Sequence, residues 1–408
     1  MIDNLPNGWK VEKLEDITEF ITCGVAKRPE YVDKSVGIPF LSSKNVKENK
    51  LILNDYNYVS FQDYKQLTKY YKPQKGDILY TRVGSFGESV VINIELEFAI
   101  FVSLTIIRVK QNIINSYYLS NFLNSNYIRQ IAMEKARGIG VKNLNVSDVR
   151  EYTIPIPPLE QQEKIVKVLD LTSNLIEKQK ELLEKYDLFL KSKFIEMFGD
   201  PITNPMGWEN DVLSNVCPNK GDFVDGPFGS DLKVSDRTDE GIRIIQINNV
   251  GENEFRDKNK AFIRQEKYLT LKRHEVLQND IIIAKMGEPI ARSCFLPKHI
   301  DKAIIVADCM RMRITNNDYN RVFICFYLNF YTTKVLIDNL SHGSTRTRIN
   351  LSILKTLEII KPKVELQNKF ALIVEKIETI KEKENQKLKQ FEDLHNSMMN
   401  KAFKGEIK

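Results

Sequence analysis

The hydrophobic pattern of the chain predicts a long helix near its middle. After Pro157-Pro158, apolar residues recur every seven positions in two rows, with Lys, Glu and Gln between them. The rows are Val168, Leu175, Leu182 and Phe189, and Leu169, Ile176, Leu183 and Leu190. We therefore expect a coiled-coil helix over 158–198 that ends at Gly199 and Pro201, because these residues do not continue a helix.

A second amphipathic segment closes the chain, over 363–408. Its apolar positions are Phe370, Ile373, Ile377, Ile380, Leu388, Phe391, Leu394 and Met398, and the polar stretch 381–387 interrupts them. Neither helix could bury its apolar stripe alone, so we expect the two helices to pack on each other antiparallel. Two unrelated amphipathic helices on separate cores are the alternative. A helix of about 35 residues would be about 50 Å long, which suits a spacer.

The sequence also repeats itself at about half its length. "IPIPPLEQQEKIVKVLD" at 154–170 has a weaker copy, "IIKPKVELQNKFALIVE", at 359–375. Pairs that share an offset of 205 residues (367 − 162) include Gln162 and Gln367, Asn145 and Asn350, and Pro157 and Pro362. Order and spacing are kept together, which excludes chance similarity and predicts a duplicated unit, a domain followed by a helix. Lys363 and Val364 replace Pro158 and Leu159, so we expect a looser hinge in the second copy.

The segments before each helix mix strand-like and helix-like patterns. The strand-like runs are 76–83, 101–109, 242–247, 280–286 and 303–314, and 116–136 has a helical pattern. The predicted fold class is α+β, with two similar globular α/β domains in a pseudo-two-fold arrangement, separated by two long antiparallel coiled-coil helices. The predicted segments are a first domain at 1–157, a helix at 158–198, a second domain at 199–362 and a helix at 363–408.

Composition adds limits on location and partners. The net charge is +6, from 60 basic and 54 acidic residues, which permits a polyanionic partner without requiring one. Five cysteines without a C-x-x-C pair are typical of reduced thiols. The amino terminus has no apolar signal segment and no stretch is long enough to span a membrane, so we expect a soluble cytoplasmic protein.

The sequence lacks the patterns of common catalytic sites. The segment "GPFGSDLK" (226–233) has glycines but not the lysine placement of a phosphate-binding loop. The four histidines have no metal-ligand spacing. Asp280, Lys285 and Glu288 come nearest to a nuclease cluster, but their order does not fit. We therefore expect no catalytic residue and no metal or cofactor in this chain.

Basic residues near glycines and amides are the candidate DNA-binding residues. Arg and Lys commonly read guanine and contact phosphates, and glycine allows a close backbone approach. The candidates are Lys27, Arg28, Lys44, Arg82, Arg137 and Lys142 in the first half, and Lys233, Arg243, Lys285, Arg292, Arg346 and Arg348 in the second. Arg82-Val83-Gly84 and Lys285-Met286-Gly287 are predicted to occupy the same place in the two copies.

These features together resemble a known family. The Pro-Pro-Leu-x-x-Gln block before a coiled-coil helix, its weaker copy, the Gly-Trp openings at Trp9 and Trp208, "GPFGSDLK" and the closing "NKAFKGEI" are similar to the specificity (S) subunit of type I restriction-modification systems. The resemblance covers the whole chain. It implies two target recognition domains, each reading half of a bipartite asymmetric sequence of double-stranded DNA, with helices that set the gap between the halves.

The resemblance also implies partners. Two methylation subunits would carry S-adenosylmethionine, and up to two restriction subunits would use ATP and magnesium. Two other hypotheses remain open at this point: a coiled-coil adaptor that binds only proteins, and a self-contained DNA enzyme. Salt-dependent DNA binding would argue against the adaptor, and methyl transfer by the chain alone would favour the enzyme.

Overall fold

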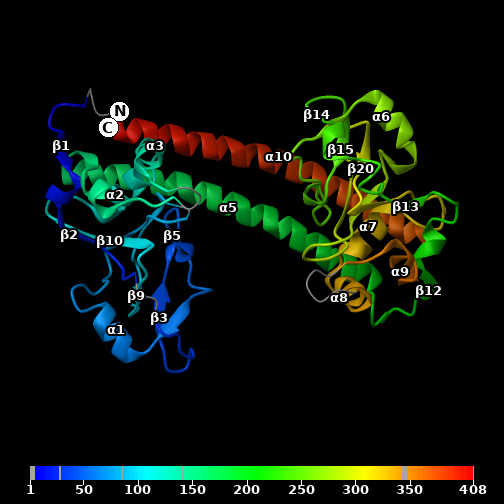
Figure 1. Ribbon diagram of the computed structural model, residues 1–408, viewed down its shortest axis with the longest axis horizontal. Helices are drawn as coiled ribbons and strands as arrows, with labels where there is room; N and C mark the ends of the chain where they lie inside the picture. Colours follow the sequence, from blue (N-terminus) through cyan, green and yellow to red (C-terminus); the bar gives the residue numbers. More distant parts are fainter. Residues whose placement is uncertain (1–4, 27–28, 85, 139–141, 342–347, 408) are drawn as a thin grey trace. The chain divides into compact units, whose positions relative to one another are not determined.

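The computed structural model describes residues 5–26, 29–84, 86–138, 142–341 and 348–407. The chain forms two compact units (Figure 1). Unit 1 comprises Met1–Lys180 and Gln386–Lys408, and unit 2 comprises Glu181–Asn385. The boundary between the units therefore falls near the middle of each long helix, so about half of each helix belongs to each unit. The division into two domains and two helices at residues 157, 198 and 362 stays a prediction.

Unit 1 contains short strands and helices before the first long helix. Its strands are β1 (Lys10–Lys13), β2 (Thr18–Cys23), β3 (Ile38–Leu41), β4 (Val46–Lys47), β5 (Lys50–Leu51), β6 (Asn57–Val59), β7 (Ile78–Thr81), β8 (Ser89–Val91), β9 (Ala99–Ile100), β10 (Leu104–Val109) and β11 (Thr153–Ile156). Its short helices are α1 (Phe61–Leu67), α2 (Ser116–Leu123), α3 (Asn126–Lys135) and α4 (Val146–Arg150).

Unit 2 has the same kinds of elements. Its strands are β12 (Glu209–Val212), β13 (Phe223–Asp225), β14 (Arg237–Thr238), β15 (Ile242–Ile245), β16 (Phe262–Ile263), β17 (Glu275–Leu277), β18 (Ile281–Ala284), β19 (Ser293–Phe295), β20 (Lys302–Ile305), β21 (Cys309–Met312) and β22 (Glu358–Lys361). Its short helices are α6 (Gln265–Thr270), α7 (Arg321–Asn329), α8 (Tyr331–Leu340) and α9 (Leu351–Leu354).

The central sheet has the same strand order in both units. Four antiparallel strands run β2-β10-β7-β8 in unit 1 and β13-β21-β18-β19 in unit 2. A second sheet pairs β3 with β9, and β15 with β20, in parallel. The repeated topology confirms the predicted duplication and the α+β class.

The central strands are continuous apolar runs because both of their faces are buried. Along β7, Ile78 and Tyr80 pack into one apolar cluster, whereas Leu79 packs into another. A strand that is covered on both sides needs no polar face, so its sequence does not alternate.

The predicted strand runs all contain strands, with one split. The run 303–314 contains both β20 and β21, because a turn in which Cys309 N–H bonds to the Val306 carbonyl at 2.9 Å separates them. The helical stretch 116–136 is likewise divided into α2 and α3. Asn124 follows the end of the first helix, and Ser125 caps the second, since its hydroxyl accepts from the Ile128 N–H at 3.4 Å.

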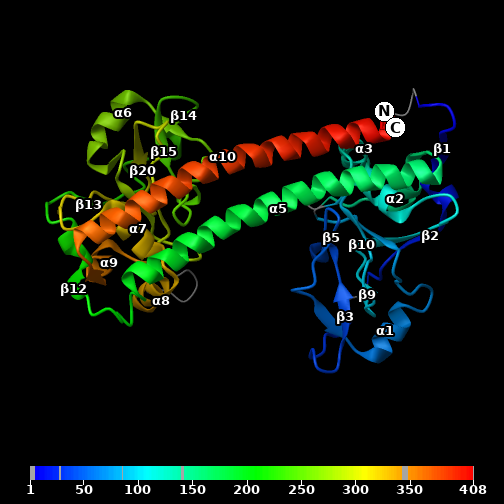
Figure 2. The same cartoon turned by 180° about the vertical axis from the view of Figure 1, so that it is seen from behind.

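The two long helices have the predicted positions. They are α5 (Leu159–Phe198) and α10 (Val364–Phe403), of 40 residues each. Gly199, at φ +76°, ends α5 in the left-handed region that glycine tolerates. In unit 1 the first part of α5 lies beside the last part of α10, as both views show (Figures 1 and 2).

Contacts within each unit show that the helices pack antiparallel. In unit 1 the Thr172 hydroxyl contacts His395 Nδ1 at 2.7 Å, and Lys180 lies 3.5 Å from Glu392. In unit 2, Lys381 forms an ion pair with Asp187 at 2.7 Å. The helix α10 continues through the polar stretch 381–387. Lys381, in this stretch, has a carboxylate partner on α5.

The two predicted heptad rows are buried to different extents. Leu169 and Leu190 of one row are buried, whereas Leu175 and Phe189 of the other are exposed by 40% and 47%. The buried side of α5 also includes polar residues that an apolar pattern does not reveal, such as Gln162.

Gln162 and Gln367 explain why the repeated block before each helix contains glutamine. Gln162 is fully buried, accepts from Asn115 N–H at 2.7 Å and donates to the Ile113 and Pro157 carbonyls. Gln367 is also fully buried, accepts from Asn320 N–H at 2.8 Å and donates to two carbonyls, one of them that of Pro362. The same amide bonds hold both helix starts, and the looser hinge in the second copy stays a prediction.

Candidate nucleic-acid interface

A group of turns meets at one end of the central sheet in each unit, and we call it the turn cluster. In unit 1, Arg82 N–H donates to the Ser103 carbonyl at 3.0 Å, and Leu144 N–H donates to the Arg82 carbonyl at 2.9 Å. In unit 2, Lys285 N–H donates to the Asp308 carbonyl at 2.9 Å, and Ile349 N–H donates to the Lys285 carbonyl at 3.0 Å. These matched bonds confirm that 82–84 and 285–287 occupy the same place in the two copies.

The segment that follows the first strand of each central sheet also belongs to the turn cluster. Gly24 and Gly226 follow the ends of β2 and β13. A Cβ on Gly24 would lie 2.1 Å from the Ile100 carbonyl oxygen, and one on Gly226 would lie 1.9 Å from that of Val306. Only glycine fits at either position. The turn cluster is thus residues 24–26, 82–84, 101–103, 137–138 and 142–144 in unit 1, and 226–234, 285–287, 306–308 and 348–349 in unit 2.

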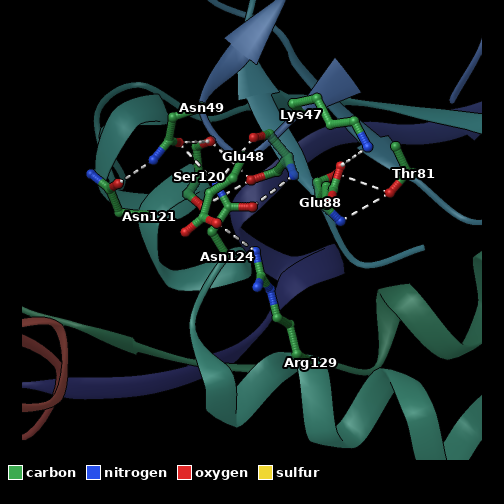
Figure 3. Close-up of polar contacts among 10 residues, drawn as sticks. Lys47, Glu48, Asn49, Thr81, Glu88, Ser120, Asn121, Asn124 and Arg129 are labelled. Atoms are coloured by element: carbon green, nitrogen blue, oxygen red, sulfur yellow. Dashed lines mark hydrogen bonds and ion pairs between the residues drawn. The ribbon is translucent and has the colours of Figure 1, made fainter. Parts of the chain in front are cut away.

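A polar network that is partly buried supports the turn in unit 1 (Figure 3). Asn49, at φ 55°, donates its N–H to the Ser89 carbonyl at 2.9 Å and accepts from Asn124 at 2.9 Å. Asn124 in turn accepts from Ser89 N–H at 2.8 Å. Glu88 N–H, at the end of the turn, donates to the Thr81 hydroxyl at 2.9 Å. The strand that follows the turn, β8, is therefore held by side-chain amides as well as by its hydrogen bonds in the sheet.

Unit 2 contains a copy of this network. Asn253, at φ 54°, donates its N–H to the Ser293 carbonyl at 2.9 Å and accepts from Asn329 at 2.8 Å. Asn329 accepts from Ser293 N–H at 3.0 Å. The two units thus present their turn clusters on the same rigid support.

Three of the predicted DNA-binding residues are buried. Arg82, Arg243 and Lys285 are exposed by 8%, 4% and 6%. Lys285 pairs with Asp225 at 2.6 Å, and Arg243 pairs with Asp257 at 3.1 Å. Arg82 donates to the Asn143 side-chain oxygen at 3.3 Å. Burial and internal partners favour a structural role for these three residues over contact with DNA.

Arg292 and Lys44 also have internal partners. Arg292 is half-buried and donates to the Val250 and Pro289 carbonyls at 3.0 and 2.8 Å. Its burial lowers the pKa of its guanidinium from the usual value. Lys44 is exposed and pairs with Asp55 at 2.9 Å, and it lies outside the turn cluster. Lys27, Arg28 and Arg346 lie outside the described residues.

The remaining candidates are exposed cations of the turn clusters. In unit 1 the Arg137 side chain is 75% exposed and 4.0 Å from Asp148, and Lys142 is exposed. In unit 2 Lys233 is exposed, and the Arg348 side chain is 47% exposed and 3.6 Å from Asp308. Salt bridges with such exposure are weak, so these four cations remain available to an anionic partner.

Sequence reasoning missed the aromatic residue of the unit 2 cluster. Phe228 is 80% exposed, between Gly226 and Gly229. Segment 226–233 contributes to the family resemblance and does not fit a phosphate-binding loop, and neither observation points to Phe228. The signal that could have drawn attention to it is an aromatic residue framed by glycines, which is unusual in a solvent-exposed turn.

Neither a metal centre nor a reactive thiol stands out. Within the described ranges, no group of three or more His, Cys, Asp or Glu side chains could hold a metal ion. All five cysteines are free, and burial raises the pKa of Cys217 to about 12. Among the helices described, none is long and apolar enough to cross a membrane.

One buried cation differs between the units and gives a pH-dependent prediction. In unit 1, Arg129 on α3 pairs with Glu48 at 3.0 Å (Figure 3). In unit 2 the corresponding Lys334 on α8 is 8% exposed, and its amine has no hydrogen-bond partner among the described residues. Burial lowers the pKa of Lys334 from 10.5 to about 7.

Lys334→Met is therefore expected to stabilise unit 2 at pH 7. Because the pKa of Lys334 is lower in the folded state, the unfolded chain binds the extra proton between about pH 7 and pH 10. Wild-type stability should rise with pH in that window by up to about 1.4 kcal/mol per unit. Thermal unfolding from pH 6.5 to 9.5 should show the variant's advantage shrinking as pH rises. An advantage that stays constant, or that also appears in Lys220→Ala, would contradict this account.

Similarity to known proteins agrees with the duplicated architecture. Residues 6–185 and 230–390 match the family model of the type I restriction modification DNA specificity domain. The chain is 23% identical to the type I restriction enzyme MjaVIII specificity subunit of Methanocaldococcus jannaschii, over 99% of this chain and 94% of that protein. It is 21% identical to the EcoKI specificity subunit of Escherichia coli, over 99% and 90% of the two chains.

A solved structure has the same fold. The crystal structure of a type I restriction-modification system S subunit from M. genitalium superposes with a TM-score of 0.53 at 14% identity, covering 99% of this chain and 97% of that one. The family model covers well over half of the chain, in two matches that fall one on each side of residue 200. The protein therefore belongs to the family of type I restriction modification DNA specificity proteins.

Proposed function

We propose that each unit of this protein reads one half of a bipartite DNA target. The observation that carries the proposal is the turn cluster, which has the same backbone hydrogen bonds in both units but different exposed side chains. Arg137 and Lys142 are exposed in unit 1, and Lys233 and Arg348 in unit 2. Two readers with the same scaffold and different side chains suit a target with two different halves.

Contacts to phosphate and to bases would have separate roles. Exposed Arg and Lys side chains supply phosphate contacts, which set affinity and its dependence on salt. Base-edge contacts set the sequence that is read. Long helices shared between the units would set the gap between the half-sites.

Partner proteins would supply the chemistry. Relatives are named specificity subunits of type I restriction enzymes, and we infer that this chain likewise specifies the target while other subunits catalyse. Two methylation subunits would bring S-adenosylmethionine, and restriction subunits would use ATP and magnesium. Exposed apolar residues on the long helices, including Leu171 at 66%, Leu188 at 61% and Leu372 at 58%, support a protein partner on these helices.

Arg348→Ala tests the DNA-binding face. If Arg348 contacts a phosphate, its loss should weaken binding of target and non-target duplexes about equally. The slope of log affinity against log salt should fall by about 1. Lys220→Ala is the matched control, because Lys220 is an exposed lysine that precedes β13, at the other end of the strand from the turn cluster. Equal behaviour of the two variants in fluorescence anisotropy titrations would contradict the proposed face.

A further inference from the structure

Phe228 is an exposed aromatic residue at the tip of a turn in unit 2. Its side chain is 80% exposed, and Gly226 and Gly229 lie on either side of it. Leaving a phenylalanine in water forgoes the free energy of burial, so a strongly exposed ring on a structured turn is available to a binding partner.

The turn that carries Phe228 is fixed at both ends. Gly226 N–H donates to the Cys309 carbonyl at 2.9 Å, and the backbone of Gly226 packs against the Val306 carbonyl too closely for any side chain. After the tip, Asp231 N–H donates to the Phe228 carbonyl at 2.9 Å. Leu232 then packs into an apolar cluster with Tyr268. The backbone therefore holds the ring outward.

Both signs of charge lie near this turn, since Asp231 is exposed on it together with the cations. Lys233 is exposed five residues after Phe228. The segment that Gly226 touches, 306–307, leads into Asp308, whose side chain lies 3.6 Å from the exposed Arg348. An exposed aromatic ring with Lys233 and Arg348 nearby suits a duplex, whose bases are apolar on their faces and whose backbone is anionic.

Unit 1 differs at the corresponding turn. Gly24 matches Gly226, since its N–H donates to the Leu104 carbonyl at 3.1 Å and a Cβ there would clash with the Ile100 carbonyl. The sequence that follows Gly24 contains Lys27 and Arg28 and no aromatic residue before Tyr31. The sequences that follow the two matched glycines thus differ in chemistry, basic in one unit and aromatic in the other.

We propose that Phe228 makes an apolar contact with the bases of the half-site that unit 2 reads, and so helps to determine its sequence. This inference rests on the proposed function. Aromatic side chains contact bases by inserting at a base step or by packing against the thymine methyl group, and both contacts depend on sequence. A phosphate-binding cation would contribute affinity without sequence preference.

The test measures binding of the full chain, with its methylation partner, to two fluorescent duplexes. One duplex carries the motif methylated in a host that produces the wild-type protein, and the other is a scrambled duplex of the same composition. Phe228→Ala should weaken target binding about tenfold, leave scrambled binding within about twofold, and leave the salt slope unchanged. Tyr331→Ala, which removes an exposed aromatic of unit 2 on α8, should leave both affinities unchanged.

Each other outcome has a defined meaning. Equal loss on both duplexes, or loss of assembly with the methylation partner, would overturn the role of Phe228 as a base contact. Unchanged target binding in Phe228→Ala, while the wild type prefers the target, would overturn this inference alone. A wild-type complex without any preference for the target would overturn the proposed function instead.

Discussion

Inserting seven residues into both long helices is expected to abolish the wild-type DNA motif and to leave, at most, a motif with a longer gap. The insertions follow Leu182 in α5 and Asn385 in α10, next to the boundary between the units. Within-unit pairs such as Lys180–Glu392 and Asp187–Lys381 lie on either side of the insertions and are kept. Seven helical residues add about 10 Å, which corresponds to about three base pairs of DNA.

The measurement is the methylated motif in a host that produces the variant with its methylation partner. An insertion in α5 alone is the control, because it moves Asp187 away from Lys381 and should prevent the helices from pairing in register. If the double insertion leaves the gap unchanged, the helices do not set the spacing between half-sites.

Phe194→Ala is expected to lower the free energy of unfolding of unit 2 by about 3–5 kcal/mol. Phe194 is fully buried where α5 meets α10 and α7. Its ring lies 5.0 Å from Phe198, 5.8 Å from Phe323 and 5.5 Å from Phe370. Truncation leaves a cavity that the surrounding rings cannot fill, because they are held by three different helices.

Phe189→Ala is the matched control for this prediction. Phe189 lies on the same helix but is 47% exposed, so its loss should cost less than about 1 kcal/mol. Hydrogen exchange by mass spectrometry should show reduced protection in peptides of unit 2 and unchanged protection in peptides of unit 1. Equal destabilisation by the two substitutions would show that the aromatic cluster does not hold unit 2 together.

The repeat and the long helices could be predicted because their signals are local. Apolar residues at heptad spacing, the ends at Gly199 and Pro201, and the offset shared by Gln162 and Gln367 are all visible along the chain. The bonds that the glutamines make were not predictable. They reach Asn115 and Asn320, which are 47 residues away in both copies.

The candidate site was harder to predict because exposure depends on distant partners. In the sequence, Arg82 and Lys285 cannot be distinguished from exposed cations near a glycine. Their burial is set by Asn143 and Asp225, which are 61 and 60 residues away. Phe228 shows the opposite case, since an apolar residue is expected inside and only the fixed turn keeps it outside.

The most direct test of the account is the methylome of a host that produces this protein with its methylation partner, compared with a host that lacks only this protein. The account predicts a new asymmetric motif in two parts separated by a fixed gap, with methylated adenine in both parts. An unchanged methylome, with the partner present and bound, would contradict the account and favour a coiled-coil adaptor that binds only proteins.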